Sequence, residues 1–192
     1  MEAMKDRDGQ YFLRGIIHID DAYLGGELNG GKAGRGSENK IPFVVALEMS
    51  DKNRPIHLKL NQVSGFTSDA IETWSLESLA PGAVVFSDGL ACFRAVAAAG
   101  CDHVPVVIGD RKPRDVPLFQ WLNTIIGNVK MALSGTYHAF NYKKYGARYL
   151  AEISYRFNRR FYLKGLLQRL LLAGIGCEPR PERLLRSAEL CC

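Results

Sequence analysis

Two apolar runs lie on either side of a short polar turn, and they restrict the possible folds more than any other part of the sequence. Residues 41–49 (IPFVVALEM) and 54–63 (RPIHLKLNQV) both have the composition of strands, and Ser50-Asp51-Lys52-Asn53 separates them. Two strand-forming runs joined by so short a turn predict an antiparallel hairpin. The chain is therefore expected to contain a sheet that is not purely parallel.

A further run, Leu13–Asp20, precedes the hairpin and also predicts a strand. Ile17 and Ile19 point to one face of it, and His18 points to the other. Asp20 ends this predicted strand on the same face as His18. The first strand is therefore expected to bury one face and to place a carboxylate at its end.

The spacing of apolar residues changes after the hairpin, and helices alternate with short strands. The predicted elements are a helix at 68–79 with Ser68 as its N-cap, a strand at 83–87, a helix at 91–99, a strand at 103–108, an amphipathic helix at 118–133 and a long helix at 142–172 that breaks near Gly165. This order predicts an α/β fold with a mixed five-stranded sheet, an antiparallel hairpin plus parallel strands, flanked by helices. Doubly wound nucleotide-binding folds and ribonuclease H-like folds are the two alternatives, and the hairpin favours the ribonuclease H-like one.

The length of 192 residues fits one domain, predicted over residues 1–173, followed by a C-terminal tail over residues 174–192. No apolar run is long enough to span a membrane, so no membrane partner is expected. The five cysteines and four histidines lack the spacing of a zinc site. This predicts a cytoplasmic setting and no structural metal.

Charge is distributed unevenly along the chain. Residues 1–110 contain 10 basic and 15 acidic residues, whereas residues 111–192 contain 15 basic and 5 acidic residues. Such asymmetry favours a basic surface for a polyanion. An ordinary solvated surface is the alternative interpretation.

A glycine-rich segment resembles a phosphate-binding loop without matching it. Gly26–Ala33 follows the spacing of that loop, but Ala33 stands where a serine or threonine binds magnesium. Gly34 and Gly36 follow, so no helix is expected to begin there and present its N-terminus to a phosphate. The segment therefore predicts no nucleotide cofactor.

Two aspartates stand at predicted strand ends. Asp20 ends the first strand, and Asp88 directly follows the short strand AVVFS. If these strands are neighbours, both carboxylates meet at one edge of the sheet, where hard oxygen ligands suit Mg²⁺ or Mn²⁺. The alternative is that each aspartate only caps the turn after its strand.

Asn123 and Lys130 are seven residues apart in the predicted helix 118–133. Seven residues are close to two turns, so both side chains lie on one face, about 10 Å apart along the axis. An asparagine there offers a neutral oxygen ligand for a metal, and a lysine offers a charge for a phosphate. The alternative is two solvated polar residues beside an apolar stripe.

Five segments together carry a resemblance to a known family. They are IHIDDAYLGG, GRGSENK, VVFSDGLACF, WLNTIIGNVKMALSGTYHAF and RYLAEISYRFNRRF. In this order and spacing they resemble the insertion-sequence transposases of the ISXO2-like group, whose catalytic cores belong to the DDE class. The resemblance extends from about Gly15 to Phe161, and it implies that residues 1–173 form a ribonuclease H-like transposase catalytic domain.

The resemblance implies roles for four residues. The first and second acids of the family correspond to Asp20 and Asp88, the third position to Asn123, and the family's lysine to Lys130. Asp21 is the rival for the first position, and both the resemblance and the alternation of the strand favour Asp20. The branch that the chain resembles carries Asn in place of the usual Glu. The implied metal ligands are the first three residues, and the implied cofactors are two Mg²⁺ or Mn²⁺ ions.

The same resemblance implies metal-dependent cleavage and strand transfer of double-stranded DNA by a homo-oligomer on the element ends and target. Two other functions stay open: a catalytically inactive remnant that only binds DNA, and a nuclease of the same fold that does not join strands. Members of this family usually have an N-terminal zinc ribbon and a DNA reader, whereas this chain begins almost at its first predicted strand. Terminal-repeat recognition is therefore expected to be missing or to come from another chain.

Basic residues in the second half are spaced to follow a DNA backbone. They are Lys130, Lys143, Lys144, Arg148, Arg156, Arg159 and Arg160, and a solvated helix face is the alternative. Tyr137 and His138 are expected either near DNA or in the core. The stripe formed by Tyr145, Tyr149, Ile153 and Phe157 predicts packing rather than base stacking.

Overall fold

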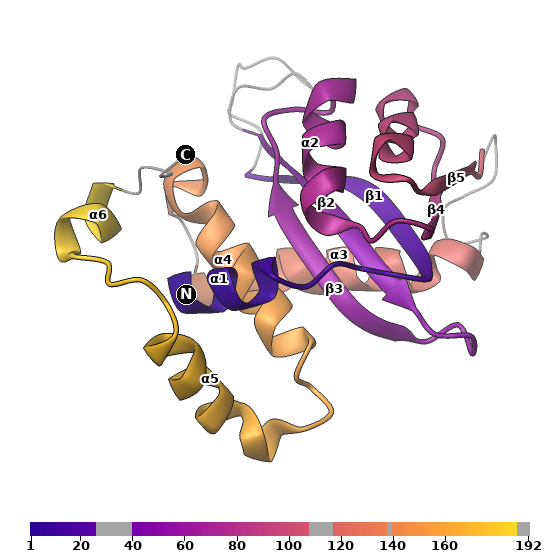
Figure 1. The fold of residues 1–192 in the computed structure, drawn as a ribbon. Helices are drawn as coiled ribbons and strands as arrows, with labels where there is room; N and C mark the ends of the chain where they lie inside the picture. The colour runs from indigo at the N-terminus through magenta and orange to yellow at the C-terminus, as the bar shows by residue number, and fades with distance from the viewer. Residues whose placement is uncertain (26–39, 108–116, 138–139, 188–192) are drawn as a thin grey trace.

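A five-stranded sheet organises the molecule, as the computed structural model shows over the residues it describes, 1–25, 40–107, 117–137 and 140–187 (Figure 1). The strands are β1 (Ile16–Leu24), β2 (Ile41–Met49), β3 (Pro55–Gln62), β4 (Val84–Ser87) and β5 (Asp102–Pro105). Their order in the sheet is β3-β2-β1-β4-β5. β1, β2 and β3 pair antiparallel, whereas β4 lies parallel to β1 and β5 parallel to β4. The predicted α/β fold with a mixed five-stranded sheet is confirmed, and it is consistent with a ribonuclease H-like fold.

The described residues also form helical segments. They are α1 (Glu2–Gly9), α2 (Ser68–Ser78), η1 (Ala91–Ala99), η3 (Pro117–Phe119), α3 (Gln120–Ala132), η4 (Leu133–Tyr137), α4 (Tyr142–Phe157), η5 (Leu163–Gly165), α5 (Leu166–Ile175) and α6 (Glu182–Ser187). The N-cap of α2 is Thr67 rather than the predicted Ser68. Within the described ranges, none of these helices combines the length and the apolar character needed to cross a lipid bilayer.

β1 is the central strand, and its side chains alternate between two apolar cores. Ile17 and Ile19 are fully buried in the core under α2 and η1. Ala22 and Leu24 point into the opposite core, under α3 and α4. β2 contributes to both cores, so seven consecutive residues of it, Phe43–Met49, are buried. The apolar run 41–49 is therefore a strand covered on both faces.

The predicted limits of the first strand, Leu13–Asp20, were wrong. β1 begins after Gly15, whose φ of +67° turns the backbone out of strand conformation. Leu13 instead makes an isolated parallel bridge with Leu79. β1 continues to Leu24, since its pairing with β2 extends to that residue and the side chains beyond Asp20 alternate into the cores. Asp20 therefore lies inside β1 rather than at its end.

The predicted long helix 142–172 was also wrong, because it ends at Phe157 and a new helix begins only at residue 163. A break near Gly165 was expected, and the observed break lies just before that residue. We attribute the end of α4 to tertiary contacts, because the side chain of Asn158, which directly follows the helix, bonds to the edge strand β3. The Leu58 N–H donates to Asn158 Oδ1 (2.7 Å), and Asn158 Nδ2 donates to the Leu58 carbonyl (3.0 Å).

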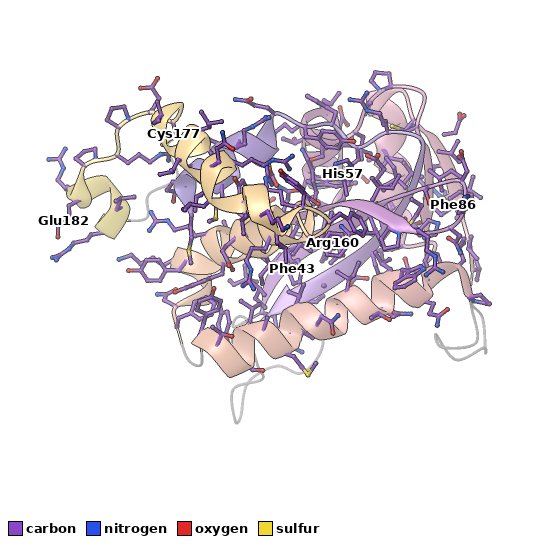
Figure 2. The ribbon with its side chains drawn as sticks, turned by 90° about the horizontal axis from the view of Figure 1, so that it is seen from below. Phe43, His57, Phe86, Arg160, Cys177 and Glu182 are labelled. Atoms are coloured by element: carbon purple, nitrogen blue, oxygen red, sulfur yellow. The ribbon has the colours of Figure 1, made fainter. Side chains whose placement is uncertain are left out.

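Arg159 and Arg160 complete this closure of the sheet edge. Arg160 donates to the backbone carbonyls of Pro55 and Ile56, at the start of β3 (Figure 2). Arg159 pairs with Asp8 of α1, with 2.7 Å between Nη2 and Oδ1. An edge strand presents unpaired backbone groups to other chains. The Asn158–Arg160 segment blunts this edge by supplying partners from the same chain.

We predict that Asn158→Ala lowers the free energy of unfolding by about 2 kcal/mol, because it leaves two backbone groups of the buried Leu58 without partners. Urea unfolding followed by tryptophan fluorescence measures this loss. The matched control is Asn128→Ala, an exposed asparagine of α3, which changes stability by less than about 0.5 kcal/mol. Equal effects of the two substitutions would show that the edge contact does not stabilise the fold.

Candidate active site

The parallel pairing of β1 with β4 determines where the two predicted aspartates lie. The paired residues are Ile16 with Val84, Ile17 with Val85 and His18 with Phe86. Asp20 and Asp88 are each two positions beyond the last pair, so the register places them level with each other. Gly89, with a φ of +91°, then turns the chain away from the sheet. Both aspartates therefore lie where the carboxyl end of β4 meets β1.

Asp21 lies in the same cluster. One carboxylate oxygen from each of Asp20, Asp21 and Asp88 lies within 4.8 Å of the other two, and all three residues are half-buried. The Asp21 N–H donates to Asp20 Oδ1 (2.9 Å), and the Leu90 N–H donates to Asp88 Oδ1 (3.1 Å). These local bonds orient two of the carboxylates.

The donor set fits a hard divalent cation. Carboxylate oxygens are the ligands that Mg²⁺ and Mn²⁺ prefer, and histidine or cysteine ligands would instead favour softer metals. Three carboxylates that approach within 4.8 Å repel one another, and a cation between them removes that repulsion. The cluster therefore matches the chemistry that the sequence predicted for this edge of the sheet.

A buried histidine connects this strand to α3. His18 is almost fully buried on the same face of β1 as Asp20, and its ring lies edge-on to Phe86 (5.7 Å between centroids) and Phe119 (6.0 Å). Burial lowers the pKa of His18, so the ring is neutral at pH 7. Phe119 immediately precedes α3. The ring contact therefore ties the start of α3 to the strand that carries Asp20.

Asn123 and Lys130 both lie on α3, which is a continuous α-helix over their whole span. Their seven-residue spacing therefore places them on one face, and both side chains are exposed. Between them, Ile125 and Val129 pack into the core beneath the helix. The structure thus brings Asp20, Asp21 and Asp88 together and keeps Asn123 and Lys130 on the surface of the adjacent helix.

Three of the seven basic residues that were expected to follow DNA are engaged within the protein. Arg159 and Arg160 close the sheet edge, and Arg148 pairs with Glu2 of α1. Their guanidinium groups hold elements of the fold together. Of the other four, Lys130, Lys143 and Arg156 are exposed and Lys144 is half-buried. Arg156 pairs with Glu152.

The aromatic residues near the helices serve mainly as core. Tyr149, Ile153 and Phe157 pack against the core under α3 and α4, which confirms the packing interpretation for these three. Tyr137 packs there too, and its hydroxyl donates to Glu152 Oε2 (3.0 Å). His138, the glycine-rich segment 26–33 and most of the GRGSENK loop lie outside the described residues.

The sheet order and the acidic cluster are those of a ribonuclease H-like domain with carboxylates gathered where β1 and β4 meet. The chain belongs to the ISXO2-like transposase domain family, whose profile matches residues 12–158, more than half of the chain. The resemblance drawn from the sequence is thereby confirmed at the level of the family. No curated protein matches the chain. The family supports a transposase function, with DNA as the implied substrate and a divalent metal as the implied cofactor.

From the sequence, Asp21 was expected only as a rival of Asp20 for one position. Adjacent residues in a strand point to opposite faces, which made a shared site for both unexpected. In the structure the two carboxylates nevertheless both lie near Asp88, just beyond the last β1–β4 pair. The run of two acids in IHIDDAYLGG was the signal for this cluster.

We predict that Asp88→Asn, without divalent ions, raises the free energy of unfolding by about 1 kcal/mol, because it removes one of three mutually repelling charges. Mg²⁺ or Mn²⁺ should then stabilise the original chain more than this variant, since bound ligands stabilise the folded state by mass action. Thermal unfolding with a chelator and with added ion measures both effects. The control is Asp51→Asn, in the exposed β2–β3 turn. If the two variants respond to the ion alike, the cluster does not bind it.

Proposed function

We propose that the chain catalyses metal-dependent cleavage of DNA and transfer of the cut strand, as the catalytic domain of an insertion-sequence transposase. The observation that carries the proposal is the cluster of Asp20, Asp21 and Asp88 where β1 and β4 meet, in a domain of a transposase family. The cluster lies where the carboxyl end of β4 meets β1, and its three carboxylates are only half-buried, which leaves them accessible to a substrate. Polynucleotide chemistry fits such a site.

Asp20 has the central role in this proposal. It lies level with Asp88 on one side and adjacent to Asp21 along the chain, and we assign it the role of a ligand that two ions would share. Asp88 would hold one ion and Asn123, through its amide oxygen, the other. When bound, two Mg²⁺ or Mn²⁺ ions supply activation of the attacking oxygen and stabilisation of the leaving oxygen. The Asp21 carboxylate adds negative charge that strengthens cation binding.

The contacts at the start of α3 support the assignment of Asn123. His18 is two residues before Asp20 on the same face of β1, and its ring touches that of Phe119. Asn123 follows Phe119 by four residues, which is about one turn and about 6 Å of helix. Two residues of strand span about 6.6 Å. Asp20 along β1 and Asn123 along α3 therefore lie at similar distances from the contact between the His18 and Phe119 rings.

Lys130 is proposed to bind a DNA phosphate two turns further along the same face of α3. Its side chain is exposed, as is that of Lys143 at the start of α4. Contacts of this kind position double-stranded DNA without reading its sequence. A second copy of the chain on the other element end would complete the reaction, so we propose a homo-oligomer on DNA.

We predict that Asp20→Asn and Asp88→Asn each reduce strand cleavage by more than about 100-fold, because each removes a ligand charge from ions that stabilise the reaction by several kcal/mol. The assay uses a supercoiled plasmid that carries the element ends, with Mg²⁺ or Mn²⁺, and scores nicking and strand joining separately. Asp51→Asn, in the β2–β3 turn, is the control and keeps full activity. Full nicking by either site variant contradicts its role. Nicking without joining by the original chain would favour the nuclease alternative.

A separate prediction concerns α3. Asn123→Ala should raise the Mg²⁺ concentration needed for half-maximal nicking, because one oxygen ligand is lost. Lys130→Ala should leave that concentration unchanged and reduce the slope of log affinity for DNA against log salt by about one, since one phosphate contact disappears. The controls are Asn128→Ala on another face of α3 and Lys52→Ala in the β2–β3 turn. Unchanged metal dependence and salt slope would show that the shared face is not functional.

A further inference from the structure

α5 is apolar on nearly all sides. Of its ten residues, LLQRLLLAGI, only Gln168 and Arg169 have polar side chains. Leu166 and Leu170 are half-buried and Ala173 is buried, on a helix that packs against α1. A helix that is apolar all round is normally buried all round. In this chain, the side of α5 that faces away from α1 is open.

The open side carries an oblique apolar stripe. Leu163, Leu167, Leu171 and Ile175 follow one another at intervals of four residues, so they form one line along η5 and α5. They are 64%, 69%, 59% and 82% exposed. Figure 1 shows α5 standing out from the body of the molecule, beside α1 and away from the sheet. The stripe is therefore an exposed ridge rather than part of either core.

The apolar area of this ridge is large for a free surface. Phe161 and Leu172 are also 81% and 63% exposed and lie directly before or on the helix. With ordinary side-chain areas, the six residues together expose roughly 600 Å². That equals the upper range of the largest apolar patch on a typical monomer. Two such surfaces bury roughly 1,200 Å², which reaches the area of specific, stable interfaces.

We propose that the outer face of α5 binds the α5 of a second copy of this chain. The stripe is its own complement when two copies pack antiparallel about a two-fold axis midway between Leu167 and Leu171. Leu167 of each copy then lies opposite Leu171 of the other, and Leu163 lies opposite Ile175. Gly174 adjoins the stripe and lets the helices approach closely.

The charges on α5 suit this arrangement. By helical rotation, Arg169 points away from the stripe, so the two copies do not bring like charges together at the centre. Lys164 lies at the margin, opposite the other copy's Gly174, where its aliphatic stem covers apolar surface. A helix that lies on a membrane instead needs a charged face opposite its apolar face. In α5, Arg169 is the one charged residue opposite the stripe, and it lies beside the apolar Leu166, Leu170 and Ala173. So small a charged face disfavours a membrane.

Self-association through α5 leaves the active site open. Figure 2 shows Cys177 and Glu182, which follow α5, at the end of the molecule opposite to Phe86. Phe86 is two residues before Asp88. α5 also lies outside residues 12–158, the part that matches the family profile. The proposed interface therefore stands on observations separate from those that support catalysis.

Sedimentation of the full chain without DNA or metal tests the proposal. The original chain should form dimers at micromolar concentration, and Leu171→Glu should weaken self-association at least tenfold. The matched control is Leu76→Glu, an isolated exposed leucine on α2, which should leave the dimer intact. Circular dichroism and thermal unfolding verify that both variants fold. A monomeric original chain, or equal dimer stability in both variants, overturns the proposal.

Mixing two variants tests the antiparallel register. Leu167→Lys on one copy lies opposite Leu171→Glu on the other, so the mixture should associate at least tenfold more tightly than either variant alone. No gain on mixing overturns the arrangement. Flotation with phosphatidylserine vesicles completes the test. If the original chain is a monomer that binds the vesicles, and Leu171→Glu abolishes this binding, the ridge is a membrane-binding surface and the proposal is overturned.

Discussion

The parallel pairing of β1 with β4 is the constraint on which the site depends. β1 is covered on both faces, so a slip of one residue would exchange Ile17 and Ile19 with the side chains of the opposite core. The apolar pattern therefore determines the register. The register in turn places Asp20 level with Asp88, and no separate interaction is needed to bring the carboxylates together. Packing of the core and assembly of the acidic cluster are consequences of one strand alignment.

The uneven charge of the chain has a partly internal explanation. α1 contributes Glu2, Asp6 and Asp8 from the acidic half, and Arg148, Arg159 and Arg180 from the basic half pair with them. Part of the basic excess thus forms ion pairs that join α1 to α4, to the residues just after α4 and to the segment after α5. The basic surface left for a polyanion is smaller than the sequence suggests, and it includes the exposed Lys130 and Lys143.

The sequence was sufficient for the order of the strands, the hairpin and the limits of β2, because these follow from apolar spacing within each segment. It was insufficient where contacts between distant parts of the chain determine where an element begins or ends. β1 extends past Asp20 only because β2 continues to pair with it. The helix ends at Phe157 because Asn158 bonds to Leu58, one hundred residues away. α1 has no apolar stripe and is held mainly by ion pairs, so no periodicity could reveal it. Asp21 joins the cluster through the local path of the backbone, which alternation alone does not predict.

The most direct test of the central claim is a crystal structure of the chain grown with Mn²⁺, with the ions located by their anomalous scattering. We expect an ion bound by both Asp20 and Asp88, with the Asn123 amide oxygen bound to that ion or to a second one beside it. Ions found elsewhere, or Asp20 and Asp88 bound to no common ion in a crystal that holds Mn²⁺ at other sites, would contradict it.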